Sequence, residues 1–232
     1  MHELVGNARC PGARGLSESG CVRITRPENR LDLCALYDDN VFGRWPMGMI
    51  PEFTEDGLLP PGDYEATLDE LRRSVLVVGP EDRASYPTWD AGWRGKLVDN
   101  LEVMVGQLWR VGIADIFVDG SFAEDKDHPN DIDGYFVCDL RRLASGELER
   151  ELNLLDPHKV WTWDPASRRP YRGYPKKQLP MWHQYRVELY PHFGQLSGIR
   201  DEFGNELEFP SAFRRSRRDG KPRGIVKIGG GP

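Results

Sequence analysis

The most regular hydrophobic pattern in the chain predicts an amphipathic helix over residues 93–111. Five apolar residues recur at alternating steps of four and three, which places them on one face of a helix. They are Leu97, Leu101, Met104, Leu108 and Val111. Gly112 ends this helix. Two further helices are predicted: a short one opened by the Thr-x-x-Glu capping box of Thr67 and Glu70, and one over residues 140–155 from the spacing of its Leu and Glu residues.

Short apolar runs between turn-forming residues predict four strands. The run at residues 116–118, bounded by Gly120, is too short for a helix and fits a buried strand. Further strands are expected at residues 131–138, 183–193 and 224–228. In the third of these four strands two sets of side chains alternate, so they should lie on opposite faces. The sets are Tyr185, Val187 and Leu189, and Arg186, Glu188 and Tyr190.

Together these elements predict an α+β fold, with a small mixed sheet flanked by helices, in one domain over residues 47–228. Residues 156–181 are rich in Pro, Trp, Tyr, Arg and Lys without a period, which indicates a loop or insertion beside the site. Residues 1–46 carry three of the four cysteines and no sustained period. We expect them to be a poorly ordered arm or a non-native extension, and residues 229–232 to be a flexible tail.

The composition is that of a globular protein, with 39% hydrophobic and 29% charged residues in a chain of 232. No stretch approaches the roughly 18 to 20 apolar residues that cross a bilayer, so we expect no membrane partner and a cytoplasmic location. The net charge of −6 gives no global attraction to nucleic acid. A basic stretch over residues 214–227 is either a local nucleic-acid contact or, as is usual for such runs, a solvated face. The cysteine spacing matches no zinc pattern, which favours reduced thiols.

The candidate chemistry is concentrated in residues 120–133, GSFAEDKDHPNDID. Gly120 permits close approach of the backbone to a phosphate, Ser121 adds a hydroxyl, and a helix starting just after them would present free N–H groups. Asp131 and Asp133, two apart on a strand, project to the same face with Cβ atoms roughly 6 to 7 Å apart. That separation suits two Mg²⁺ ions about 3.5 to 4 Å apart.

A third carboxylate and a cation complete the predicted site. Glu188 lies on the polar face of its strand, where it would be a third metal ligand. Lys126 could reach a phosphate as a point charge. The histidines have no nucleophile or metal partner at a readable spacing, so we expect them to be structural.

The Gly-Ser turn followed after nine residues by Asp-Ile-Asp resembles the signature of the DNA polymerase beta-like nucleotidyltransferase superfamily. Two segments, FTEDGLLPPGDYEATLDEL and DGSFAEDKDHPNDID, resemble an uncharacterised bacterial family of nucleotidyltransferase-like proteins, some of them linked to toxin–antitoxin or phage-defence loci. The resemblance covers about residues 50–228. It implies that Asp131, Asp133 and Glu188 bind metal and that Gly120 and Ser121 hold the nucleoside triphosphate, although many members of the superfamily have Asp where Glu188 stands.

Two functional hypotheses follow from these residues. The first is a Mg²⁺-dependent enzyme that moves a nucleoside monophosphate from an NTP, such as ATP, to a hydroxyl of RNA (tRNA) or of a partner protein. The basic C-terminal stretch would suit RNA and the acidic whole would suit a protein acceptor. The second is a catalytically weak nucleotide-binding or antitoxin-like interaction module of the same fold.

Overall fold

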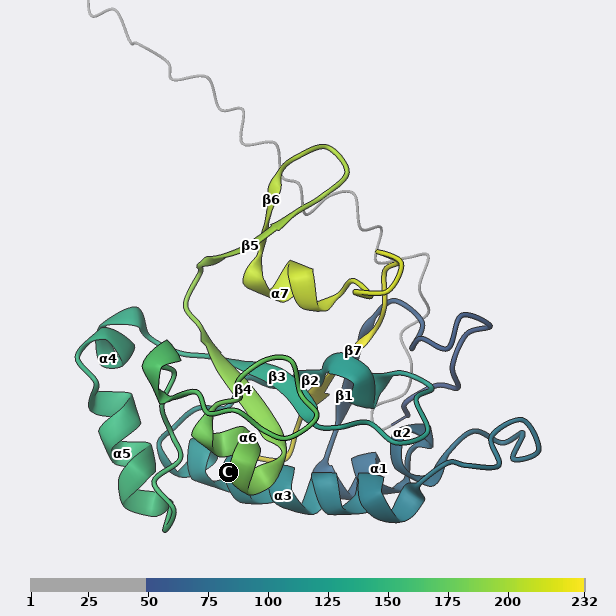
Figure 1. Cartoon of the computed structure of the whole chain (residues 1–232), viewed down its shortest axis with the longest axis horizontal. Coiled ribbons are helices and arrows are strands. Elements are labelled where there is room, and N and C mark those ends of the chain that lie inside the picture. Colours follow the sequence, from purple (N-terminus) through teal and green to yellow (C-terminus); the bar gives the residue numbers. More distant parts are fainter. Residues whose placement is uncertain (1–48, 232) are drawn as a thin grey trace, which may run out of the picture. The chain divides into compact units, whose positions relative to one another are not determined.

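The computed structural model describes residues 49–231 (Figure 1). The predictions for residues 1–46, including those for Cys10, Cys21 and Cys34, lie outside this range. No helix within the described range combines the length and the apolar character that a membrane crossing requires.

The described chain is built on a five-stranded mixed sheet in the order β1-β7-β2-β3-β4. Strand β2 is antiparallel to both of its neighbours, whereas β1 pairs with β7, and β3 with β4, in parallel. The bounds of these strands are Asp63–Ala66 (β1), Ile116–Asp119 (β2), Ile132–Val137 (β3), Val187–His192 (β4) and Ile225–Ile228 (β7). The C-terminal strand is therefore inserted between β1 and β2. The prediction of a mixed sheet flanked by helices is confirmed at this level.

Seven helices accompany the sheet in the described range. Their bounds are Leu68–Arg73 (α1), Val75–Val78 (α2), Ala91–Arg110 (α3), Leu140–Ala144 (α4), Glu147–Leu155 (α5), Pro180–Tyr185 (α6) and Phe209–Phe213 (α7). The predicted helix over residues 93–111 is confirmed as α3, and four of its five apolar residues are fully buried. The capping box is also confirmed, because Thr67 accepts from the Glu70 N–H and the Glu70 carboxylate accepts from the Thr67 N–H.

The two faces of the sheet differ in what covers them (Figure 1). One face carries apolar side chains such as Ile132, Phe136 and Leu189, which are fully buried, and α1, α3 and α6 lie along it. The other face is covered by α7 and by a two-stranded hairpin of β5 (Leu196–Arg200) and β6 (Glu206–Glu208). Tyr135 of this second face contacts Phe213 of α7, with ring centroids 5.4 Å apart.

Two predicted elements have the wrong extent. The helix expected over residues 140–155 is divided into α4 and α5, because Gly146 adopts a φ of +70° between them. The strand expected from residue 183 begins only at Val187, because Pro180 starts α6, which continues to Tyr185. Tyr185 is therefore helical and does not belong to the strand face on which it was expected. Strands β1, β5 and β6 and helix α7 were not predicted.

Candidate functional site

Three acidic side chains form one row across the middle of the sheet. Asp119 at the end of β2 is opposite Asp133 of β3, and Asp133 is opposite Glu188 of β4. Residues directly opposite each other on neighbouring strands project to the same face, with Cβ atoms about 4.5 to 5.5 Å apart in antiparallel pairs. The row lies on the face that α7 covers. Asp131 was predicted as the first residue of this strand, but it directly precedes β3.

The carboxyl groups of Asp131 and Asp133 are difficult to ionise. Burial, together with the like charge of Asp131, raises the pKa of Asp133 to about 7, although Arg217 acts in the opposite direction. Burial also raises the pKa of Asp131, against a hydrogen bond from Trp182 Nε1 of 2.6 Å, and the charge of Glu188 adds to the increase. A bound proton or a bound cation would relieve this repulsion.

Glu188 is held by groups of the protein. Its Oε1 accepts a hydrogen bond of 3.0 Å from the Leu179 N–H and lies 3.5 Å from Arg168 Nη1. Its Oε2 accepts from the hydroxyl of Tyr190. Glu188 is thus 5% exposed with both oxygens engaged. Its position beside Asp133 agrees with the predicted site, but its carboxylate has other partners.

Within residues 49–231, no three His, Cys, Asp or Glu side chains are arranged as a ready metal-binding group. Asp131 and Asp133 nevertheless suit a divalent cation, because they are neighbouring carboxylates whose repulsion raises the pKa of Asp133. Mg²⁺ prefers oxygen ligands and is commonly held by one or two carboxylates plus substrate phosphates. These two residues are therefore the ones that would hold it.

A buried ion pair next to the row was not anticipated from the sequence. Asp119 is fully buried and accepts a 2.7 Å hydrogen bond at Oδ2 from Arg223, which also pairs with Glu124. Burial raises the pKa of Asp119 to about 8 in spite of Arg223. The second oxygen of Asp119, Oδ1, has no hydrogen-bond partner in the described chain. The only signal in the sequence is that Asp119 directly precedes the Gly-Ser turn.

Gly120 is required at its position by the neighbouring strand. Its φ is +77°, and a Cβ there would lie 2.6 Å from Oδ2 of Asp133. The close neighbour of Gly120 is Asp133, and the approach of a phosphate to this glycine stays a prediction. The helix expected to follow is wrong, since residues Gly120–Ala123 form a four-residue 3-10 helix. Ser121 within it is half-buried.

The loop that follows Gly120 is shaped by Arg94 of α3, a fully buried residue. Its guanidinium donates to the backbone carbonyls of Leu76, Phe122, Glu124 and Lys126. Burial lowers the pKa of Arg94 to about 9. The charge of Lys126 partly offsets the increase that burial causes in the pKa of Asp131, and its phosphate role stays a prediction. Arg94 positions the loop but was not identified from the sequence.

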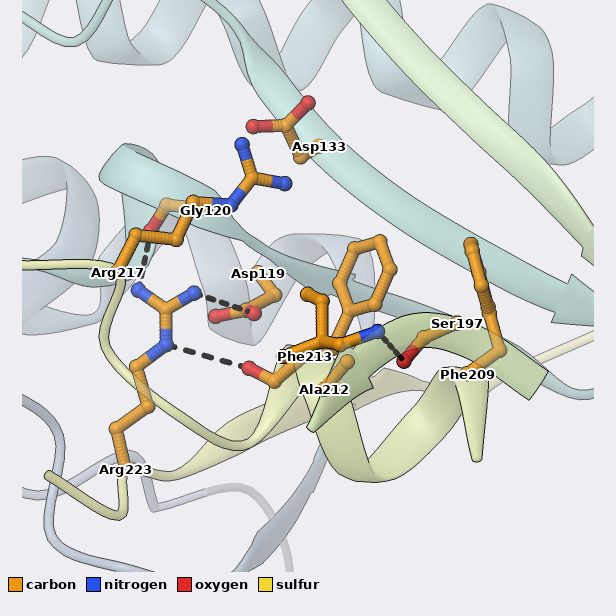
Figure 2. A pocket seen from close by; sticks show the side chains of 10 residues that line it. Asp119, Gly120, Asp133, Ser197, Phe209, Ala212, Phe213, Arg217 and Arg223 are labelled. Atoms are coloured by element: carbon orange, nitrogen blue, oxygen red, sulfur yellow. Dashed lines mark hydrogen bonds and ion pairs between the residues drawn. The ribbon is translucent and has the colours of Figure 1, made fainter. Parts of the chain in front are cut away.

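A cavity of about 140 Å³ opens under α7, above Asp119 and Asp133 of the acidic row (Figure 2). It is lined by Asp119, Gly120, Asp133, Phe209, Phe213 and Arg217, among others. Figure 2 shows the guanidinium of Arg217 directed towards the carboxylate of Asp133. A volume of this size is smaller than the roughly 300 Å³ of typical small-molecule sites. It can therefore accommodate a phosphate group but not a whole nucleotide.

Residues 51–229 match the family DUF6932, a family of unknown function. The chain belongs to this family. All residues of the row, the loop and the cavity lie inside the matched range. No curated protein and no solved structure matches the chain.

The basic C-terminal stretch of this DUF6932 protein is mostly engaged with the protein's own acids. Ion pairs join Arg214 to Asp63, Arg215 to Glu202, Lys221 to Asp56, Arg223 to Asp119 and Lys227 to Asp115. Arg218 donates to the backbone carbonyl of Asp56. The stretch therefore fastens the C-terminal segment to the rest of the domain. Arg217 alone among these cations has no ion pair or hydrogen bond within residues 49–231, and it faces the cavity.

Proposed function

We propose that this protein is a metal-dependent nucleotidyltransferase of the nucleotidyltransferase fold. The observation that carries the proposal is that Asp133 and Glu188 are opposite each other on the neighbouring strands β3 and β4, with Asp131 directly before β3. Phosphoryl and nucleotidyl transfer need carboxylates that hold divalent metal and donors that hold the triphosphate. The resemblance of the Gly-Ser and Asp-Ile-Asp motifs supports the same assignment.

In this proposal the acceptor hydroxyl oxygen attacks the α-phosphorus of an NTP. A new bond forms between oxygen and phosphorus, the bond from the α-phosphorus to the bridging oxygen breaks, and pyrophosphate leaves with the electron pair. The proton of the hydroxyl passes to Glu188 or to solvent. Mg²⁺, held by Asp131 and Asp133, would neutralise charge on the phosphates and orient them. Glu188 would first have to exchange its contacts with Tyr190 and Arg168.

The phosphates of the NTP would be held by the loop after β2 and by the C-terminal segment. Gly120 and Ser121 contribute backbone and hydroxyl groups, and Lys126 contributes a charge close to Asp131. We add Arg217 to this set, because it faces the cavity and has no protein partner within the described chain. Since the cavity fits a phosphate group only, the base and ribose would extend beyond it.

A catalytically weak nucleotide-binding or antitoxin-like module is the second candidate, and one observation favours it. Both carboxylate oxygens of Glu188 already have partners in the protein. A binding module would leave these contacts in place, whereas a catalyst would have to release them.

Label transfer tests the enzymatic proposal. The protein is incubated with α-labelled NTPs, Mg²⁺ and either total RNA or cell lysate, beside the variants Asp131→Ala and Asp133→Ala. Asp115→Ala is the matched control, because Asp115 is an exposed acid that pairs with Lys227 away from the row. We expect transfer by the wild type and the control and its loss in both variants. Transfer that survives in both variants would refute the site, and its absence from every reaction would favour the binding module.

A further inference from the structure

A second basic segment, residues 165–187, differs from the C-terminal stretch in containing no acidic residue. It carries six cations in a chain whose net charge is −6. They are Arg168, Arg169, Arg172, Lys176, Lys177 and Arg186. Such a local excess of one sign attracts a ligand of the opposite sign.

These cations are available, whereas those of the C-terminal stretch are mostly paired. Within residues 49–231, Arg168 is the only one of the six with an ion pair, to Glu188. Four of them, Arg169, Arg172, Lys176 and Lys177, are exposed. Since few protein carboxylates compete for them, these residues can contact an external anion without breaking a salt bridge.

Residues 169–178 of this segment form a closed loop, and aromatic residues fix this loop to the domain. Its neck is closed by two backbone hydrogen bonds of 2.8 Å between Arg169 and Gln178. Tyr171 and Tyr174 pack on Trp182, with ring centroids 5.0 and 4.9 Å away. The guanidinium of Arg186 lies 3.8 Å from the Trp182 ring and 4.3 Å from that of Tyr171. The loop thus presents its cations from an anchored position, and Tyr171 remains 39% exposed.

The same aromatic cluster contacts the acidic site. Trp182 donates from Nε1 to Oδ2 of Asp131 at 2.6 Å. The charge of Arg186, which packs on Trp182, partly offsets the increase that burial causes in the pKa of Asp131. A ligand lying on the loop would therefore reach the carboxylates directly.

We propose that this loop binds single-stranded nucleic acid and presents it as the acceptor of the transfer reaction. The phosphates would contact Arg172, Lys176 and Lys177, and a base would stack on Tyr171. Cations interleaved with exposed aromatic rings are the arrangement by which proteins hold single strands. An acidic peptide would use the cations but gain nothing from the ring. The acceptor role rests on the proposed function, whereas the binding itself does not.

Fluorescence anisotropy tests the binding with labelled RNA and DNA oligonucleotides of about 12 nucleotides, within the range of single-strand sites. The double variant Lys176→Ala/Lys177→Ala removes two unpaired cations of the loop. The variant Arg215→Ala/Lys221→Ala removes two paired cations of the C-terminal stretch and changes the net charge equally. We expect about a tenfold loss of affinity in the loop variant and a flatter salt dependence, by about 0.7 per lost phosphate contact. The control should bind within about twofold of the wild type.

The stacking contact is tested by Tyr171→Ala against Tyr171→Phe. The alanine variant should lose about tenfold in affinity, and phenylalanine should restore it, because stacking is sequence-tolerant and needs only a ring. The proposal fails if neither RNA nor DNA binds, if the loop and control variants weaken equally, or if polyglutamate binds with the same dependence on Tyr171.

Asp133→Asn separates the two proposals. We expect this variant to lose transfer and to keep nucleic-acid binding. Wild-type protein that binds nucleic acid but transfers no label would refute the proposed function alone, and transfer that is insensitive to the loop variants would refute the acceptor role alone.

Discussion

The two faces of the central sheet differ in their side chains, although the same strands form both: one face is apolar and the other carries acidic residues. On the face along which α1, α3 and α6 lie, β3 and β4 contribute four fully buried apolar residues: Ile132, Phe136, Val187 and Leu189. On the other face the intervening residues include Asp133 and Glu188, and Asp119 of β2 joins them. One face thus buries apolar surface, and the other keeps carboxyl groups close together with raised pKa values for Asp119 and Asp133.

This difference indicates that stability and chemistry can be altered separately in neighbouring residues. Apolar burial stabilises the domain, at about 25 cal/mol per Å² of apolar surface. Ionising acids in a desolvated row opposes folding unless a cation or a proton is bound. Truncating a buried apolar residue and neutralising Asp133 should therefore have effects of opposite sign on the free energy of unfolding.

The largest effect is expected on the apolar face. Phe136 is fully buried and packs edge-on against Trp161. Phe136→Ala should lower the free energy of unfolding by about 3 to 5 kcal/mol through lost burial and a cavity. Val137, the next residue, is 41% exposed, and Val137→Ala should cost about 0.5 kcal/mol or less. Urea denaturation of both variants measures the contrast, and equal losses would show that the faces are misassigned.

The buried pair of Asp119 and Arg223 should give the next largest effect. Arg223→Met leaves Asp119 buried without its cation, which should cost about 3 kcal/mol. The double variant Asp119→Asn/Arg223→Met should recover part of this loss, because Asp119 no longer carries an ionisable group and only Glu124 still lacks its cation. A double-mutant cycle by urea denaturation measures the coupling. Additive effects of the two single substitutions would contradict the pairing.

Asp133→Asn should stabilise the protein while it abolishes transfer. The folded pKa of Asp133, about 7, lies above its ordinary value of 3.8, so the folded state keeps the proton longer than the unfolded state. Through Asp133, the stability of the wild type should therefore fall as pH rises from about 4 to about 7. Asp119, whose folded pKa is about 8, extends the fall to about pH 8, so the variant should remove only the part that belongs to Asp133, a few kcal/mol at most. A variant that is less stable than the wild type at pH 8 would contradict this account.

The smallest effect is expected from Tyr190→Phe. The hydroxyl of Tyr190 donates to Glu188, and burial together with the charge of Glu188 raises the pKa of this tyrosine. Removal of the hydroxyl should lower the free energy of unfolding by about 0.5 kcal/mol, because Glu188 keeps its contacts with the Leu179 N–H and with Arg168. Thermal denaturation measures the change, with Tyr86→Phe as the control, because Tyr86 is half-buried and lies outside the acidic row. A loss above about 2 kcal/mol would show that the hydroxyl is essential to the position of Glu188.

Local patterns predicted those elements whose structure depends on neighbouring residues. The period of α3 and the capping box at Thr67 are confirmed, as is the alternation of Val187 and Leu189 with Glu188 and Tyr190. The break at Gly146 and the start of α6 at Pro180 were missed, although both residues are recognised signals. In both places the backbone preference of the residue, Gly146 or Pro180, determines the structure in spite of the apolar spacing around it.

Long-range pairing could not be predicted from one sequence. Asp119 and Arg223 are 104 residues apart, and their ion pair depends on the insertion of β7 beside β2. The same topology accounts for the C-terminal basic stretch, whose ion-pair partners, such as Asp63 and Asp115, lie far upstream in the chain. Sequence spacing singled out Asp131, Asp133 and Glu188, but the contacts that hold Glu188 arise from the fold.

The central claim is that the acidic face holds a divalent cation together with a nucleoside triphosphate. Isothermal titration of the wild type and of Asp133→Asn with Mn²⁺, in the presence and absence of ATP, tests it without knowledge of the acceptor. We predict that the wild type binds Mn²⁺ more tightly when ATP is present and that Asp133→Asn loses this binding. Equal Mn²⁺ binding by the two proteins, or none by the wild type with ATP, would contradict the assignment.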